Sequence, residues 1–296
     1  MRHSGMKNRG HQESSDGSIT IGYYAILYMD VLNQREKLSK IVELPTTEEE
    51  KESFFDLLRD TYGVIDGFER MFDAYLSQSS QELPSDIPEK YREQFKRLVG
   101  ENIGKTLFSD SMFYYLSLNE LDGAIPTIRI RDLLCAASSV FAGALADGNP
   151  ARGGIDVGIA ATFPRVGIYG PGLYKAYSLE SDIAKHPRIV IGSELEGYLR
   201  ASAEDVGRST ESALRRIFAQ KCLDLIYVDT DGVSALDYAG KAIRDLYPDW
   251  KGTISQATNY AQSEWERFKN EDNEKFASRY LCVLNYLNDR QKKYWT

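Results

Sequence analysis

Apolar runs alternate along this chain with stretches whose apolar residues recur at helical spacing. The run from 19 to 31 is dense in aromatic and β-branched residues, which predicts a buried strand. Residues 46–78 carry apolar side chains at helical spacing behind two threonines and three glutamates, which predicts a long amphipathic helix with a threonine cap. The stretch 104–118 places Asp110 between two apolar runs and predicts a hairpin.

The same patterns predict the remaining elements. Helices are expected after the first strand, at 89–98, 130–148 and 170–186, around 203–220 and on to the end of the chain, and strands at 152–163, 188–195 and 223–229. From 21 to 191 the order is strand, helices, strand–turn–strand, helix, strand, helix, strand. This order predicts an α/β fold of the α+β type with a ferredoxin-like βαββαβ core, in which helices cover one face of the sheet. We divide the chain into a disordered leader (1–18), a core domain (19–200) and a mostly helical C-terminal extension packed on that core (201–296).

Composition and charge narrow the classes of partner. The 296 residues are 42% hydrophobic and carry a net charge of −8, which argues against broad binding to nucleic acid or anionic membranes. The longest apolar segment, 133–146, is too short to span a bilayer, and the polar first 18 residues do not resemble a signal peptide. Three widely spaced cysteines predict reduced, buried thiols. We therefore expect a soluble, cytoplasmic protein.

Two aspartates carry the main chemical hypothesis. Asp30 ends the first predicted strand and Asp110 occupies the hairpin turn, so the predicted core brings both to one end of its central strands. Taken alone, Asp110 is more typical of a plain turn, because serine and aspartate favour turns through local hydrogen bonds. Two converging carboxylates, however, are what divalent ions need in a two-metal phosphoryl-transfer site. The loop after Asp30 adds backbone N–H groups for a triphosphate.

Four segments in sequence order resemble the motifs of class III nucleotidyl cyclases. They are ILYMDVLNQ, TLFSDSMFYY, RGGIDVGIA and FPRVGIYGPGLYKAYSLES, within residues 22–195. The resemblance implies that Asp30 and Asp110 are the catalytic aspartates, that they and the carbonyl of Val31 bind two Mn²⁺ or Mg²⁺ ions, and that 19–200 is the catalytic domain. It also implies a homodimer with its sites at the interface.

The chain departs from the purine-specific members of that family. Thr106 stands where those enzymes have a lysine or glutamate that reads the base, and Gly167 stands at the second base-reading position. Tyr174 and Ser178 replace an asparagine and an arginine that hold the ribose and the reacting phosphate. By sequence, the candidates for the missing cation are Arg152 and Lys175, with Arg35 and Lys37 after the first aspartate.

In these departures the chain resembles the pyrimidine cyclases of bacterial anti-phage (Pycsar) signalling. The resemblance implies cyclisation of UTP, favoured over CTP, to a second messenger with release of pyrophosphate. The expected substrate-binding residues are Asn33, Arg35, Thr106, Arg152, Tyr174 and Lys175. Two alternatives stay open: an inactive, cyclase-like module that binds a nucleotide or a partner, and a purine (adenylate or guanylate) cyclase with unusual base readers.

Several residues also have simpler interpretations. Arg152 is equally typical of a strand-start residue facing solvent, and an aromatic residue such as Tyr174 is more often part of a core. We expect Asp156 to be a satisfied polar residue, His186 to end a helix, and Asp229 and Asp231 to occupy a turn. LIYVDTDGV (225–233) resembles a phosphatase motif, but too few residues follow it for that fold.

Overall fold

The computed structural model describes residues 19–39, 42–81, 88–92, 103–119, 125–164 and 166–295. The strands are β1 (Thr20–Val31), β2 (Gly104–Phe108), β3 (Ser111–Ser117), β4 (Ala151–Phe163), β5 (Gly167–Tyr169), β6 (Ile189–Ile191), β7 (Ile226–Val228) and β8 (Ser234–Leu236). The α-helices are α1 (Gln34–Leu38), α2 (Glu48–Gln81), α4 (Pro126–Ala146), α5 (Pro171–Ser178), α6 (Ser193–Ala203), α7 (Thr210–Leu223), α8 (Lys241–Leu246), α9 (Lys251–Asn270) and α10 (Glu274–Tyr294). A π-helical turn, η2 (Leu179–Ile183), continues α5, and a 3₁₀ turn, η3 (Pro248–Trp250), precedes α9.

The eight strands of the described residues form one mixed sheet in the order β2-β3-β1-β4-β6-β8-β7, and β5 pairs with β4. The long central strand β1 is antiparallel to both β3 and β4, and β4 is parallel to β6. The mixed α/β class is therefore as predicted. Because β7 and β8 join this sheet, the chain beyond residue 200 contributes strands as well as helices.

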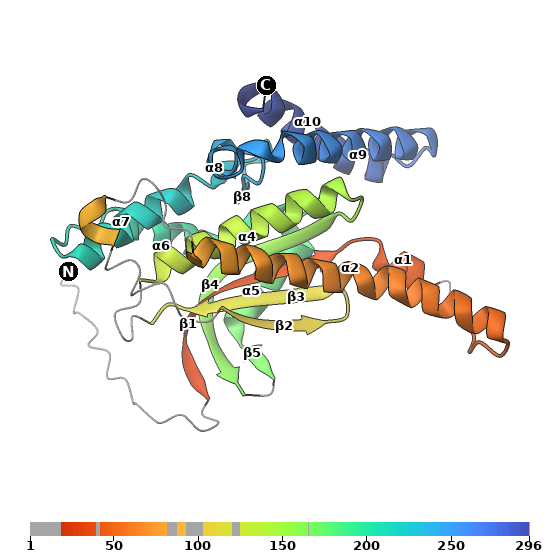
Figure 1. The fold of residues 1–296 in the computed structure, drawn as a ribbon, viewed down its shortest axis with the longest axis horizontal. Coiled ribbons are helices and arrows are strands. Elements are labelled where there is room, and N and C mark those ends of the chain that lie inside the picture. Colours follow the sequence, from red (N-terminus) through yellow and green to blue (C-terminus); the bar gives the residue numbers. More distant parts are fainter. Residues whose placement is uncertain are drawn as a thin grey trace.

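Helices cover both faces of the sheet (Figure 1). Along β1, Ala25, Leu27 and Met29 point to a large core shared with α2 and α4. Tyr24 and Ile26 point to a smaller core on the opposite face, which α5 covers. The expectation of helices on one face only is therefore wrong.

Helix α4 is buried along nearly its whole length, because α2, α7 and α9 pack around it. Helix α9 forms a hairpin with α10, and Figure 1 shows this hairpin above α4 on the side away from the sheet. Among the described residues, no helix combines the length and apolar character that a membrane crossing requires.

The long apolar patterns gave accurate bounds. Strand β1 and helix α2 match their predictions within three residues, and Thr47 Oγ1 caps α2 by accepting a hydrogen bond from the Glu50 N–H (3.2 Å). Helix α4 begins at Pro126, four residues earlier than expected, with proline in its first turn. The leader 1–18 and most of the helix expected at 89–98 lie outside the described residues.

The segment from 170 to 203 differs most from its prediction. The helix expected at 170–186 is divided into α5 and the π-helical turn η2, and the strand expected at 188–195 is only β6. Helix α6 begins at Ser193, inside that predicted strand. The cause is a long-range cap: the carboxylate of Asp156 on β4 accepts a hydrogen bond from the Leu195 N–H (2.8 Å), so Asp156 is a satisfied polar residue as expected.

Candidate active site

Strand pairing brings the two predicted aspartates to the same corner of the sheet. Asp30 lies near the end of β1, directly opposite Ser111 on β3 and Arg152 on β4. Asp110 occupies the two-residue turn between β2 and β3, and its carbonyl accepts a hydrogen bond from the Val31 N–H (3.1 Å). The charge of Asp110 is close enough to raise the pKa of Asp30.

A chain of hydroxyl groups orients Asp30. Ser111 Oγ donates to the Asp30 carboxylate (3.0 Å), and the hydroxyl of Tyr28 is hydrogen-bonded to Ser111 Oγ (2.8 Å). Burial raises the pKa of Asp30 above its ordinary value, and the negative charge of Asp110 raises it further, against the opposing effects of Ser111 and Arg152. Ionised Asp30 therefore lacks full compensation by positive charge.

Arg152 does not face solvent, so that simpler interpretation is wrong. Its Nη2 lies 2.6 Å from the carboxylate of Glu180 on η2, and its Nη1 donates to the carbonyl of Ala184 (3.4 Å). The buried Nε of Arg152 has no hydrogen-bond partner among the described residues. Burial raises the pKa of Glu180 to about 7, with attraction to Arg152 acting in the opposite direction. Glu180 was missed by the sequence analysis.

This raised pKa predicts a pH dependence of stability. Below the ordinary pKa of 4.5, Glu180 is protonated in both the folded and unfolded states. Between 4.5 and about 7 the unfolded chain loses this proton while the folded chain keeps it, so the free energy of unfolding falls as pH rises through that window. We expect Glu180→Gln to remove this part of the slope in urea unfolding measured from pH 4 to pH 8. An unchanged slope would contradict the raised pKa.

The donor atoms at this corner suit a hard divalent cation. Two aspartates lie at this corner, and a metal ion would relieve the repulsion that raises the pKa of Asp30. Asp30, Asp110 and the carbonyl of Val31 are the residues that would hold it. In the described part of the chain, no cluster of three or more His, Cys, Asp or Glu side chains forms a metal site, so further ligands would come from substrate phosphates or water.

Thr106 and Gly167, the two positions that the resemblance predicts to lie against the base, meet on a separate part of the sheet. Thr106 on β2 lies against Gly167 on β5, and both line a hollow of about 690 Å³ with Tyr24, Tyr115 and Thr162. Gly167 has φ +88°, and a Cβ there would collide with the Thr106 hydroxyl. Any side chain at position 167 would therefore be strained and would crowd Thr106.

The other substrate-binding candidates lie on α5 and directly after β1. Tyr174 is 70% exposed on α5, so its interpretation as a core residue is wrong. Lys175 lies 3.6 Å from Glu194 and is partly exposed. Asn33 follows β1 in the left-handed conformation (φ 70°). Arg35 lies on α1, and its side chain is outside the described residues.

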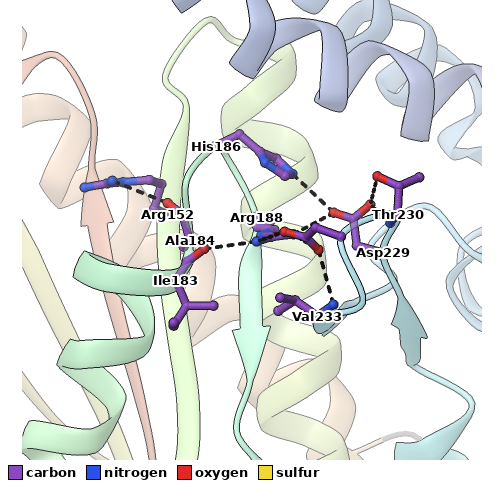
Figure 2. A network of polar contacts seen from close by, with 9 residues as sticks. Arg152, Ile183, Ala184, His186, Arg188, Asp229, Thr230 and Val233 are labelled. Atoms are coloured by element: carbon purple, nitrogen blue, oxygen red, sulfur yellow. Dashed lines mark hydrogen bonds and ion pairs between the residues drawn. The ribbon is translucent and has the colours of Figure 1, made fainter. Parts of the chain in front are cut away.

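A polar network next to the carboxylate corner was not anticipated (Figure 2). The guanidinium of Arg188 is fully buried and binds the carboxylates of Asp229 (2.8 Å) and Asp231 (2.7 Å) and the carbonyl of Ile183 (3.0 Å). Asp229 and Asp231 do lie in the β7–β8 turn, as expected. Through Arg188, the two aspartates also fix Ile183 at the end of η2. Arg152 fixes the next residue, Ala184.

The sequence also predicted environments for His186 and the three cysteines. His186 follows η2, and its Nε2 lies 3.3 Å from Asp229, so its partner is this network. Cys135 and Cys222 are buried free thiols, as predicted. The prediction is wrong for Cys282, which is exposed on α10 because its side of that helix is not covered by the core.

Comparisons with protein-family models, with curated proteins and with solved structures find no match to this chain.

Proposed function

We propose that this protein is a metal-dependent nucleotide cyclase of the class III type. Its substrate is a pyrimidine nucleoside triphosphate, UTP in preference to CTP, and its products are the 3′,5′-cyclic monophosphate and pyrophosphate. The cyclic nucleotide serves as a second messenger in anti-phage defence. The observation that carries this proposal is the convergence of Asp30 and Asp110 at one corner of the sheet. The negative charge of Asp30 is not fully compensated there.

The strand order supports a ferredoxin-like core. β2, β3, β1 and β4 are adjacent in this order, each antiparallel to its neighbour, with α2 between β1 and β2 in the chain and α4 between β3 and β4. This order supports the proposed βαββαβ plan, in which the end of the first strand and the central hairpin turn share an edge. The residues in those two positions here are Asp30 and Asp110.

The proposed reaction is an in-line displacement. The 3′-hydroxyl of the ribose gives its proton to water and its oxygen forms a bond to the α-phosphorus, while the bond from that phosphorus to the bridging oxygen breaks and pyrophosphate leaves with the electron pair. Divalent ions, when bound, lower the pKa of the hydroxyl and neutralise the phosphates. The chain itself orients Asp30 through Ser111 and Tyr28, and Arg152 adds positive charge on the opposite side of Asp30.

The hollow around Thr106 is the proposed base-binding site. A hydroxyl both donates and accepts hydrogen bonds, so Thr106 can pair with the carbonyl and N–H groups on the edge of a pyrimidine. The purine enzymes have a lysine or glutamate at the first of these positions and an aspartate or cysteine at the second. Thr106 and Gly167 stand there in this chain, so neither pair is present. These features favour a pyrimidine over a purine.

We propose that a second copy of the chain completes the site. Tyr24 in the hollow and Asp30 lie on the same face of β1 but are six residues, about 20 Å, apart along the strand. Between Tyr24 and Asp30, the ring of Tyr28 packs against the rings of Phe113 and Tyr177. At the same end of the sheet as the hollow, but on its opposite face, apolar side chains on paired strands are exposed: Ile21, Tyr23, Ile159 and Tyr169. The proposed dimer therefore rests on the separation of the hollow from Asp30, and a second copy would bring its own carboxylates to the hollow.

The proposal is tested by incubating the protein with each of the four nucleoside triphosphates and Mn²⁺, then separating products against cyclic standards. The expected product is cyclic UMP, with less cyclic CMP and little from ATP or GTP. Cyclic AMP or cyclic GMP as the main product would favour the purine alternative. Nucleotide binding without turnover would favour the non-enzymatic module, which the replacement of the family's asparagine and arginine by Tyr174 and Ser178 supports.

Removing the hydroxyl that orients Asp30 should reduce activity without unfolding the protein. We expect Ser111→Ala to lower kcat/KM by roughly 10- to 100-fold, because residues that orient metal ligands typically contribute that much. Tyr28→Phe should have a smaller effect, since it removes only the partner of Ser111. Ser138→Ala, which removes a buried hydroxyl on α4, is the control and should leave kcat/KM unchanged. Equal effects of Ser111→Ala and Ser138→Ala would contradict this role.

A further inference from the structure

The position of Arg152 at the carboxylate corner depends on η2. Arg152 is paired with Asp30 across β4 and β1, so both side chains lie on the same face of the sheet. The guanidinium of Arg152 has two partners at η2. Its Nη2 lies 2.6 Å from the carboxylate of Glu180, and its Nη1 donates to the carbonyl of Ala184 (3.4 Å). A shift of η2 would therefore move this guanidinium relative to Asp30.

The η2 turn has little apolar packing of its own. Of its five residues, only Glu180 is buried. The turn is closed by a hydrogen bond from the Ala184 N–H to the carbonyl of Leu179 (2.9 Å), in a π-helical geometry that is rare in proteins. The turn lies close to β4 because Gly154 has no Cβ, which would collide with the side chain of Leu179. Polar contacts therefore decide where η2 lies.

Arg188 supplies such a contact at the end of η2. Its side chain is 2% exposed, and its Nη2 donates to the carbonyl of Ile183, the last residue of the turn (3.0 Å). Figure 2 shows Arg152 and Arg188 on the two sides of Ile183 and Ala184. The backbone carbonyl of Arg188 also accepts a hydrogen bond from the N–H of Gly153, the residue after Arg152 (3.0 Å). The two arginines therefore hold one short segment between them.

The β7–β8 turn fixes Arg188 in turn. The guanidinium of Arg188 is paired with the carboxylates of Asp229 (2.8 Å) and Asp231 (2.7 Å). Each carboxylate is itself held by a backbone N–H of the turn, that of Thr230 for Asp229 (2.7 Å) and that of Val233 for Asp231 (3.2 Å). A planar guanidinium with all of these partners has one favourable orientation, so its contact with η2 is also fixed.

We propose that Arg188 is a positioning residue for the cyclisation reaction: held by the β7–β8 turn, it fixes η2, and η2 holds Arg152 at the carboxylate corner. The inference rests on the proposed function for the reaction that Arg152 assists, but the link from Arg188 to η2 does not depend on turnover. It gives the chain beyond residue 200 a role at the site, because without the β7–β8 turn Arg188 would lose the carboxylates of Asp229 and Asp231.

The link itself is tested by comparing Arg188→Lys with the matched control Arg290→Lys. Lysine keeps the charge but lacks the planar fork that binds two carboxylates and a carbonyl together. Arg290 on α10 likewise contacts two carboxylates, those of Asp237 (2.7 Å) and Asp289 (2.6 Å), and neither belongs to the β7–β8 turn. Hydrogen exchange of the Ala184 N–H reports the opening of η2. We expect this exchange to be roughly tenfold faster or more in Arg188→Lys and unchanged in Arg290→Lys.

A double-variant cycle tests whether the link reaches Arg152. Arg188→Lys should lower kcat for UTP roughly tenfold or more, because small displacements of a positioned group have effects of that size. If Arg188 acts through Arg152, adding Arg188→Lys to Arg152→Gln should lower kcat no further. A merely structural role would lower kcat by the same factor in both backgrounds. Arg290→Lys should leave kcat per folded molecule unchanged.

The two measurements separate failure of the inference from failure of the proposed function. Unchanged Ala184 exchange in Arg188→Lys, or an equal loss of kcat with and without Arg152, would overturn the inference. Faster exchange in a protein that forms no cyclic nucleotide would support the link to η2 while refuting the proposed function. If Arg188→Lys does not fold, Asp231→Asn replaces it, because the Asp231 side chain is 46% exposed and Asp229 still pairs with Arg188. Smaller changes in the same direction are expected there, and no change in exchange would again overturn the inference.

Discussion

Replacing either carboxylate at the sheet corner should abolish cyclisation. We expect Asp30→Asn and Asp110→Asn each to lower the rate of cyclic UMP formation by roughly 10²- to 10³-fold or more, because charge stabilisation is the main contribution of such a site to catalysis. Both variants should remain folded, since each removes one of two mutually repelling charges. In the absence of metal, their free energy of unfolding should equal or exceed that of the parent protein.

The response to Mn²⁺ distinguishes loss of the site from loss of the fold. An ion that binds only the folded protein stabilises it by about 2.7 kcal/mol at 100 times its Kd. We expect this stabilisation in the parent protein and in the control Asp182→Asn, which removes an exposed carboxylate on neighbouring η2. It should be absent from Asp30→Asn and Asp110→Asn. Full activity in either of these two variants would contradict the metal site.

Mixing two inactive variants should restore activity if sites are shared between chains. Thr106→Trp fills the hollow on β2, a strand at the edge of the sheet, and should be inactive on its own. Mixed with Asp30→Asn, it should recover roughly a quarter of the parent activity, because half of the randomly formed dimers are mixed and each mixed dimer has one intact site.

The matched control for this experiment is a mixture of Asp30→Asn and Asp110→Asn. Both carboxylates of a site come from one chain, so every site in that mixture lacks one of them and no activity should return. Rescue in this control, or no rescue in the first mixture, would show that base and carboxylates are not contributed by different chains.

The parts of the corner that follow from local pattern were predictable. Strand β1 ends where its apolar run ends, and the hairpin turn falls at the polar interruption between β2 and β3. The positions of Asp30 and Asp110 follow from these two features once strand order is assumed. The proline in the first turn of α4 also indicates where that helix begins, but the prediction did not use it.

The remaining features depend on contacts between distant segments. Glu180 lies in a π-helical turn for which the sequence pattern gives no signal, and Arg188 is buried only because the β7–β8 turn supplies two carboxylates. Strands β5 and β8 have three residues each, too short to show a period of two. Such contacts are set by tertiary structure, so one sequence read locally does not reveal them.

The most direct test of the central claim is the product balance with UTP labelled at its α-phosphorus, in the presence of Mn²⁺. The account predicts labelled cyclic UMP and one pyrophosphate for each molecule formed, with neither product from Asp30→Asn. Labelled UMP or UDP as the product would show hydrolysis instead of cyclisation. Unchanged UTP, with the protein folded and Mn²⁺ bound, would show that the carboxylate corner is not a cyclase site.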